Sequence, residues 1–136
     1  MREEILYPSV EELKTLYDHI VRTSGGEHGY LSKSNLEYLL DTVKDVGERL
    51  EKRQAIIKKS AFLLYNVIVV HPFLNGNKRT AFELAKLFLK ANGFGLKADA
   101  GETYGFLLRL ASGNASESEA EEWLAMHLTE SKRNQR

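Results

Sequence analysis

One segment in the middle of the chain constrains the fold more than any other. From Gln54 to Val70, apolar residues recur at helical spacing, and other apolar residues fill the remaining faces of the same helix. The residues at helical spacing are Ile57, Ala61, Leu64, Tyr65 and Ile68. A helix that is apolar on nearly every side is usually surrounded by other elements. The segment therefore predicts the central helix of a bundle.

The end of this segment has an alternative interpretation as a buried β-strand over residues 67–70. All of these residues are β-branched, a composition that favours strands. However, no turn signal separates them from the helical pattern that precedes them. We therefore favour a helix that continues to the residue before His71-Pro72.

Three further helices are predicted by a serine followed three residues later by a glutamate, the spacing of a helix-capping box. The pairs are Ser9 with Glu12, Ser34 with Glu37, and Ser116 with Glu119. The first of these helices should run to about Thr23, before a Gly-Gly pair.

Two more helices complete the expected fold. Residues 80–92 form a strong amphipathic pattern, which predicts a helix that starts near Lys78 and ends at Gly93. Residues 102–111 predict the other helix. Residues 44–53 are charged and aperiodic, so we interpret them as a connector or flap, and residues 94–101 as a loop. The expected fold is all-α, with six helices, a central buried helix and no sheet.

Length and composition exclude several classes of protein. The chain of 136 residues fits one domain over 1–136, in which the tail 131–136 should fray. Its 19 basic and 19 acidic side chains cancel, which disfavours nucleic acid as a partner. Cysteine is absent, so thiolate metal sites and cysteine catalysis are excluded. Without a signal-peptide core or a long apolar run, we expect a cytoplasmic protein that does not use a membrane.

A basic cluster lies at the start of the central helix, at Lys52, Arg53, Lys58 and Lys59. We interpret it as a solvated face, with docking of an acidic partner as the alternative.

The stretch from His71 to Arg79 carries the strongest functional signal. It joins two helices, so backbone N–H groups near Gly76 lie at a helix N-terminus, an arrangement that binds phosphate. Lys78 and Arg79 put two cations where the helix dipole disfavours them, unless an anion binds there. His71 could accept a proton from an attacking hydroxyl group. The structural alternatives are a helix-terminating histidine and a simple turn.

The residues HPFLNGNKRTA at 71–81 closely resemble the signature of the Fic/Doc (Fido) superfamily. Lys78 and the Thr80-Ala81 pair are similar to the Doc (death-on-curing) branch. The segments GYLSKSNLE at 29–37, LFLKANG at 87–93 and AEEWL at 120–124 also resemble the family, so the similarity spans roughly residues 28–128. The resemblance implies the compact six-helix fold of that family.

The resemblance also implies roles for individual residues. His71 matches the catalytic histidine that deprotonates a Ser, Thr or Tyr hydroxyl of a protein target, and Phe73 matches a buried anchor of the loop. Gly76 and Asn77 would line an anion hole, and Arg79 would bind a phosphate of ATP. Lys78 stands where Fic enzymes have glycine. In Doc proteins this lysine reverses the bound ATP, so that the γ-phosphate rather than AMP is transferred.

Two positions depart from the Fic pattern. Phe82 replaces a second arginine, which agrees with Doc and argues against AMP transfer. Asn75 replaces the acidic residue that binds Mg²⁺ in the family, and its neutral carbonyl oxygen is a weaker ligand than a carboxylate.

The resulting expectation is a Doc-like toxin kinase. Its target would be a translation elongation factor, and a small antitoxin protein would neutralise it. One alternative is a Fic-type AMP-transferase. Another is a degenerate domain, disabled at Asn75, that acts as a binding module.

Overall fold

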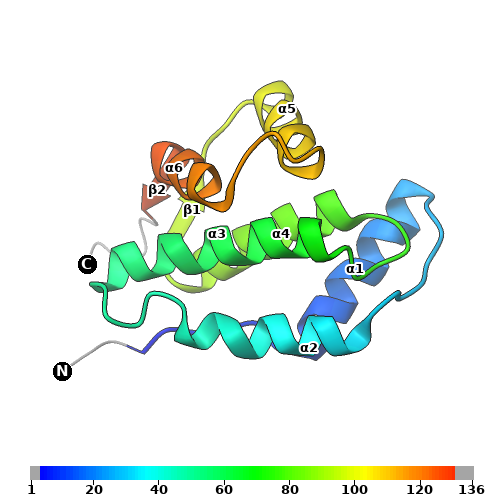
Figure 1. Ribbon diagram of the computed structural model, residues 1–136, viewed down its shortest axis with the longest axis horizontal. Helices are drawn as coiled ribbons and strands as arrows, with labels where there is room; N and C mark the ends of the chain where they lie inside the picture. The colour runs from blue at the N-terminus through cyan, green and yellow to red at the C-terminus, as the bar shows by residue number, and fades with distance from the viewer. Residues whose placement is uncertain (1–3, 131–136) are drawn as a thin grey trace.

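The computed structural model describes residues 4–130, and the tail 131–136 lies outside the described part. This part of the chain contains six helices and one two-stranded sheet, drawn in Figure 1. The α-helices are α1 (Val10–Ser24), α2 (Lys33–Thr42), α3 (Lys52–Val70), α4 (Asn77–Ala91), α5 (Ala100–Ala111) and α6 (Glu117–His127). A 3₁₀ turn, η1 (Val43–Asp45), and the strands β1 (Phe94–Leu96) and β2 (Leu128–Glu130) complete the elements. The all-α, six-helix fold is thus confirmed.

Helix α3 is the centre of the bundle, as its sequence predicts. It packs against α4 and α6 most extensively and also contacts α2 and α5. Its buried apolar residues lie on several faces, and they include Ile56, Leu63, Leu64 and Val67. The helix continues to Val70, so the strand considered for residues 67–70 is not formed.

Two of the three predicted capping boxes are present. The Ser9 and Ser116 hydroxyls accept backbone N–H groups at the starts of α1 and α6, with Glu12 and Glu119 completing the boxes. The prediction at Ser34 was wrong.

The second helix is capped instead by Ser32, whose Oγ accepts the N–H of Asn35 at 3.2 Å. The physical reason is tertiary. The backbone N–H of Ser32 donates to Pro72 O at 3.1 Å, which helps to hold residue 32 extended and lets the helix begin directly after it.

The expected loop at 94–101 and the expected absence of a sheet were also wrong. β1 pairs antiparallel with β2, with Gly95 opposite Thr129, and Lys97 N donates to His127 O at 2.9 Å. Each strand has three residues, too few to show an alternating pattern. The pairing depends on the chain that follows α6.

The connector expected at 44–53 begins as the 3₁₀ turn and ends where α3 starts, at Lys52. Its fold depends on Lys59, which is 1% exposed and not part of a solvated face. The Lys59 Nζ donates to the carbonyls of Val43, Lys44 and Val46 at 3.1, 3.0 and 2.7 Å. This ammonium group therefore donates to carbonyls of η1 and of Val46, which directly follows η1.

None of the helices within residues 4–130 combines the length and the hydropathy that a membrane span requires.

Candidate active site

The loop between α3 and α4 carries the predicted functional residues. His71 ends α3, with its N–H donating to Val67 O at 3.1 Å, and its side chain is exposed. Within residues 4–130 it is the one residue other than glycine with a positive φ, at φ 60° and ψ 56°. A left-handed conformation strains a residue with a Cβ by roughly 1–2 kcal/mol. Such strain is most often retained at functional sites.

Phe73 anchors the loop in the core, as expected from its position. Its side chain is fully buried, and its ring stacks on Tyr17 of α1 with ring centroids 3.9 Å apart. The centroid of the Tyr30 ring lies 5.7 Å from that of the Phe73 ring. The loop backbone is therefore fixed by an aromatic cluster beneath it.

Asn77 closes the loop with its side chain. Its Oδ1 accepts the N–H of Phe73 at 3.0 Å, and its Nδ2 donates to Phe73 O at 2.8 Å. The Asn77 side chain is buried and holds the loop through these two bonds, and Asn77 is the first residue of α4. Gly76, at φ 78°, supplies the left-handed turn between Phe73 and Asn77.

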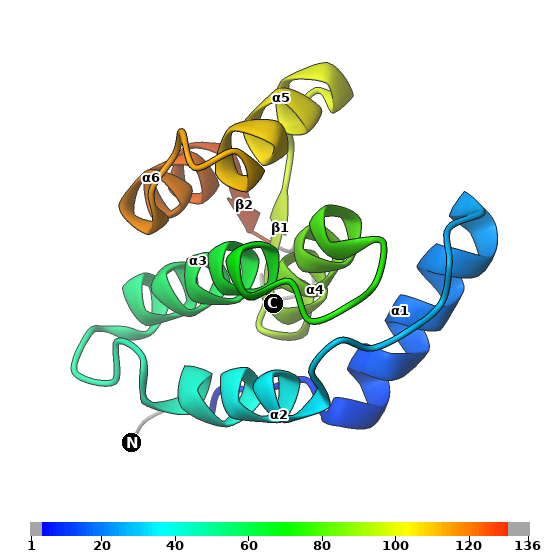
Figure 2. The same ribbon diagram turned by 45° about the vertical axis from the view of Figure 1, so that its right-hand side comes forward.

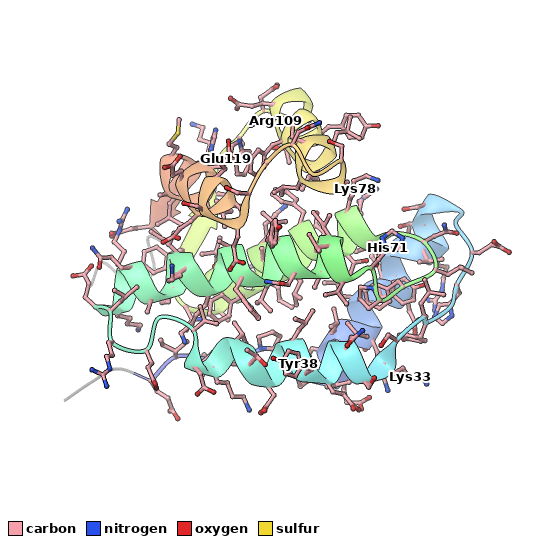
Figure 3. The ribbon with its side chains drawn as sticks, in the orientation of Figure 1. Lys33, Tyr38, His71, Lys78, Arg109 and Glu119 are labelled. Atoms are coloured by element: carbon pink, nitrogen blue, oxygen red, sulfur yellow. The ribbon has the colours of Figure 1, made fainter. Side chains whose placement is uncertain are left out.

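The start of α4 has the features of an anion site. Its first intrahelical bond runs from Thr80 N to Gly76 O at 2.9 Å, so the earlier N–H groups have no helical acceptor. Gly76 has no side chain to cap them, and no acidic residue lies in the first turn. Lys78 and Arg79 are in this turn, and Figure 3 shows Lys78 and His71 at the same end of the molecule. Backbone donors, helix dipole and two cations thus favour a phosphate here.

Hydrogen bonds from the segment between α1 and α2 hold the loop between α3 and α4 in place. Leu31 N donates to Pro72 O at 2.7 Å, and Leu74 N donates to Gly29 O at 2.8 Å. The Tyr17 hydroxyl donates to Gly29 O at 2.8 Å and accepts the N–H of Gly29 at 2.9 Å. Sequence patterns place Tyr17 on an apolar helix face and give no sign of this second role.

The surroundings of Tyr30, whose ring lies beside that of Phe73, favour the neutral form of its hydroxyl. Burial, followed by the nearby Asp18 carboxylate, raises the pKa of Tyr30. Asp18 in turn contacts the His28 ring at the edge of the same cluster.

The Asn75 side chain also joins this loop to the segment between α1 and α2. Its Oδ1 accepts the backbone N–H of Glu27 at 2.8 Å, and its Cβ lies 3.2 Å from where a Cβ on Gly26 would be. Among residues 4–130, no group of three or more His, Asp or Glu side chains could hold a metal ion. The residues here do not form a protein-built Mg²⁺ site, and Asn75 would offer such an ion one neutral carbonyl oxygen, a weaker ligand than a carboxylate.

Thr80 lies directly beneath the loop. It is fully buried, and its hydroxyl is the buried side-chain group within the described residues that has no hydrogen-bond partner. Its Oγ1 is 3.8 Å from where a Cβ on Gly76 would be, so this unpaired group faces the turn at the start of α4.

Comparison with known proteins gives this arrangement a family. A family model described as the Fic/DOC family matches residues 7–89, and the chain belongs to that family. The protein adenylyltransferase fic-1 of Caenorhabditis elegans is 31% identical over 78 residues, which is 54% of this chain. The chain spans 15% of the length of that relative.

Proposed function

We propose that this protein is a Doc-like kinase that transfers the γ-phosphate of ATP to a Ser or Thr hydroxyl of a protein target. The observation that carries the proposal is the loop itself. It sets an exposed histidine against a helix start that has free backbone donors and two cations. Fic/DOC membership supports a group transfer from a nucleotide to a protein hydroxyl.

In the proposed reaction, the target hydroxyl oxygen attacks the γ-phosphorus and His71 takes the hydroxyl proton. The bond between the γ-phosphorus and the β–γ bridging oxygen breaks, and ADP leaves with the electron pair. Arg79, Lys78 and the N–H groups at the start of α4 stabilise the charge on the phosphoryl oxygens. The magnesium ion that accompanies ATP neutralises part of the same charge.

The choice of γ-phosphate transfer rests on two residues. Lys78 fills the position at which Fic enzymes have glycine, and Phe82 replaces their second arginine. Both agree with the Doc branch, in which the nucleotide binds reversed. We further propose a translation elongation factor as the target, a small antitoxin protein as the inhibitor and the cytoplasm as the location, in line with that branch.

A second candidate function is AMP transfer. The relative from Caenorhabditis elegans is named a protein adenylyltransferase, which favours this reaction. The attack would then be at the α-phosphorus, the α–β bond would break, and pyrophosphate would leave. The same histidine and anion site would serve either reaction.

The test is transfer of label from ATP to protein in a cell extract. ATP labelled at the γ-phosphate should label a protein band, and ATP labelled at the α-phosphate should not. The His71→Ala variant should lose the label, and the His19→Ala variant, with an exposed histidine removed from α1, should keep it. Label from the α-phosphate alone would establish AMP transfer. No label from either would favour a binding module.

A further inference from the structure

The hydroxyl of Thr80 is an exception among the buried polar side chains of residues 4–130. Those buried polar or charged residues are Lys59, Ser60, Asn77, Thr80 and Asn92. The side chains of the others all make hydrogen bonds, whereas the hydroxyl of Thr80 makes none. A buried hydroxyl without a partner destabilises the folded state, because it has lost its bonds to water and gained none in return. In this conformation the Thr80 hydroxyl therefore does not serve the stability of the fold.

The position of Thr80 in its helix does not explain the missing bond. Thr80 is the fourth residue of α4, and Thr103 is the fourth residue of α5. The Thr103 hydroxyl donates to the carbonyl of Asp99, the N-cap residue of α5, at 2.9 Å. The equivalent bond of Thr80 would go to the carbonyl of Gly76, the N-cap residue of α4.

The conformation of the N-cap residue distinguishes the two helix starts. Asp99 is extended, at φ −64° and ψ 143°, whereas Gly76 is left-handed, at φ 78° and ψ 18°. These angles set the direction of the carbonyl group, and the Gly76 oxygen accepts the N–H of Thr80 but not its hydroxyl. Glycine adopts left-handed and extended conformations with similar ease. The turn can therefore move toward the extended conformation, which is usual for an N-cap residue, and so pair the hydroxyl.

The inner side of this turn is apolar apart from the hydroxyl. A Cβ on Gly76 would lie 3.6 Å from Val21 Cγ2, 3.8 Å from Ile20 Cγ2 and 3.8 Å from Thr80 Oγ1. Both methyl groups belong to α1, and Figure 2 shows the loop between α3 and α4 on the side of the molecule where α1 lies. The Thr80 hydroxyl thus faces the peptide groups of the turn in apolar surroundings, where a hydrogen bond is stronger than in water.

We propose that Thr80 is a positioning residue of the anion site, and that its hydroxyl donates to the Gly76 carbonyl when a phosphate group binds at the start of α4. The proposal rests on the proposed function, because it concerns the same phosphate site. The Gly76 carbonyl and the N–H of Asn77 belong to one peptide group, and this N–H is the first donor of α4. A hydrogen bond to the carbonyl polarises the peptide and strengthens its N–H as a donor. Thr80 thus acts on the phosphate through this peptide and does not touch it.

The first variant, Thr80→Val, keeps the shape of the side chain and removes the hydroxyl. Its free energy of unfolding should be equal to or greater than that of the unaltered protein, because valine leaves no unpaired polar group in the core. Its affinity for inorganic tripolyphosphate should fall by roughly two- to tenfold, the contribution of one neutral hydrogen bond. Urea unfolding and isothermal titration calorimetry measure the two effects.

The second variant, Thr80→Ser, keeps the hydroxyl and removes a buried methyl group. It should retain the affinity that Thr80→Val loses, although the missing methyl group should lower its stability. Stability and affinity thus rank the two variants in opposite orders. A side chain that only fills space at this position cannot produce that result.

The matched control is Ser60→Ala in α3. The Ser60 hydroxyl is also buried, and it donates to Ile56 O, four residues earlier, at 2.8 Å. This variant should lose stability and bind tripolyphosphate as the unaltered protein does. A further readout needs no variant. The resonance of the Gly76 carbonyl carbon should move downfield when tripolyphosphate is added, as expected for a carbonyl that accepts a second hydrogen bond.

Each contrary result has a distinct meaning. Unchanged affinity in Thr80→Val, or a Gly76 resonance that does not move, would overturn the positioning role and leave the proposed kinase in place. Equal loss of affinity in Thr80→Val and Thr80→Ser would also overturn it, since packing rather than the hydroxyl would then be responsible. An unaltered protein that binds no tripolyphosphate would overturn the anion site and the proposed function together.

Discussion

The side-chain oxygen of Asn75 accepts a hydrogen bond from the backbone N–H of Glu27 at 2.8 Å. This bond ties the loop between α3 and α4 to the connection between α1 and α2, at the position where the loop has asparagine in place of the acidic residue that the resemblance implies. An aspartate could accept the same N–H, because its carboxylate oxygens are acceptors as well. The difference between the two residues is therefore one of charge rather than of loop geometry.

We expect Asn75→Asp to lower the Mg²⁺ concentration needed for phosphate transfer and to raise the rate. A carboxylate binds Mg²⁺ more strongly than an amide oxygen and keeps the bond to Glu27. The measurement is a Mg²⁺ titration of γ-phosphate transfer by both proteins, with Asn75→Ala as a variant that lacks the bond. Superimposable curves for asparagine and aspartate would show that residue 75 does not contact the ion. An unaltered protein that is inactive at every Mg²⁺ concentration, with activity gained by the aspartate, would favour the binding-module alternative.

His71→Gly should be more stable than the unaltered protein and inactive. Glycine adopts the left-handed conformation at residue 71 without a Cβ clash, so the free energy of unfolding should rise by about 1 kcal/mol. Loss of the base should lower transfer by roughly 10²- to 10⁴-fold. Thermal unfolding and a transfer assay test the two effects. His71→Ala keeps the Cβ and should lose activity without the gain in stability; equal stability of the two variants would contradict the strain at this position.

Arg79→Ala should weaken the binding of both MgATP and tripolyphosphate, because it removes a charge-assisted contact to phosphate. Lys78→Gly should admit the nucleotide in the orientation of Fic enzymes and give some AMP transfer. Calorimetry measures the first effect, and label from the α-phosphate measures the second. Unchanged nucleotide binding in both variants would contradict the assignment of an anion site to the start of α4.

Lys59→Met should change how stability depends on pH. Burial lowers the pKa of Lys59 below its ordinary value of 10.5, although Asp45 and Glu48 partly oppose this effect. Between the two pKa values the unfolded chain binds more protons at this site, so the contribution of Lys59 to stability rises with pH. Urea unfolding at increasing pH, up to 10.5, should therefore show the unaltered protein gaining on the variant. The control is Lys97→Met, which removes an exposed lysine outside this cluster.

The helices could be predicted from sequence because their signals are local. Serine caps, glycine ends and apolar spacing lie within each segment, and α1, α3 and α6 follow them closely. The features that sequence reasoning missed depend on distant partners. β1 needs β2, which lies more than thirty residues later. The buried position of Lys59 depends on the path of the chain before α3.

The same distinction applies to the candidate site. The glycine turn and the two cations are close together in sequence, so their position at the start of α4, in the loop that follows His71, could be predicted. The hydrogen bonds of Asn75 and Tyr17 could not be predicted. The partner of Asn75 is 48 positions away, and the apolar pattern of its helix assigns Tyr17 to the core. The side-chain bonds of Asn77 to Phe73 are local, but the spacing of four residues alone does not distinguish them from a helical pair.

The pairing of residues 29–32 with Pro72 and Leu74 is made by main-chain atoms. Because every residue except proline offers the same N–H and C=O groups, most substitutions along this connection preserve the bonding. Insertion or deletion of a single residue would instead shift each donor away from its acceptor. The connection between α1 and α2 is thus free to vary in its exposed side chains, while its length is fixed by the loop that it holds.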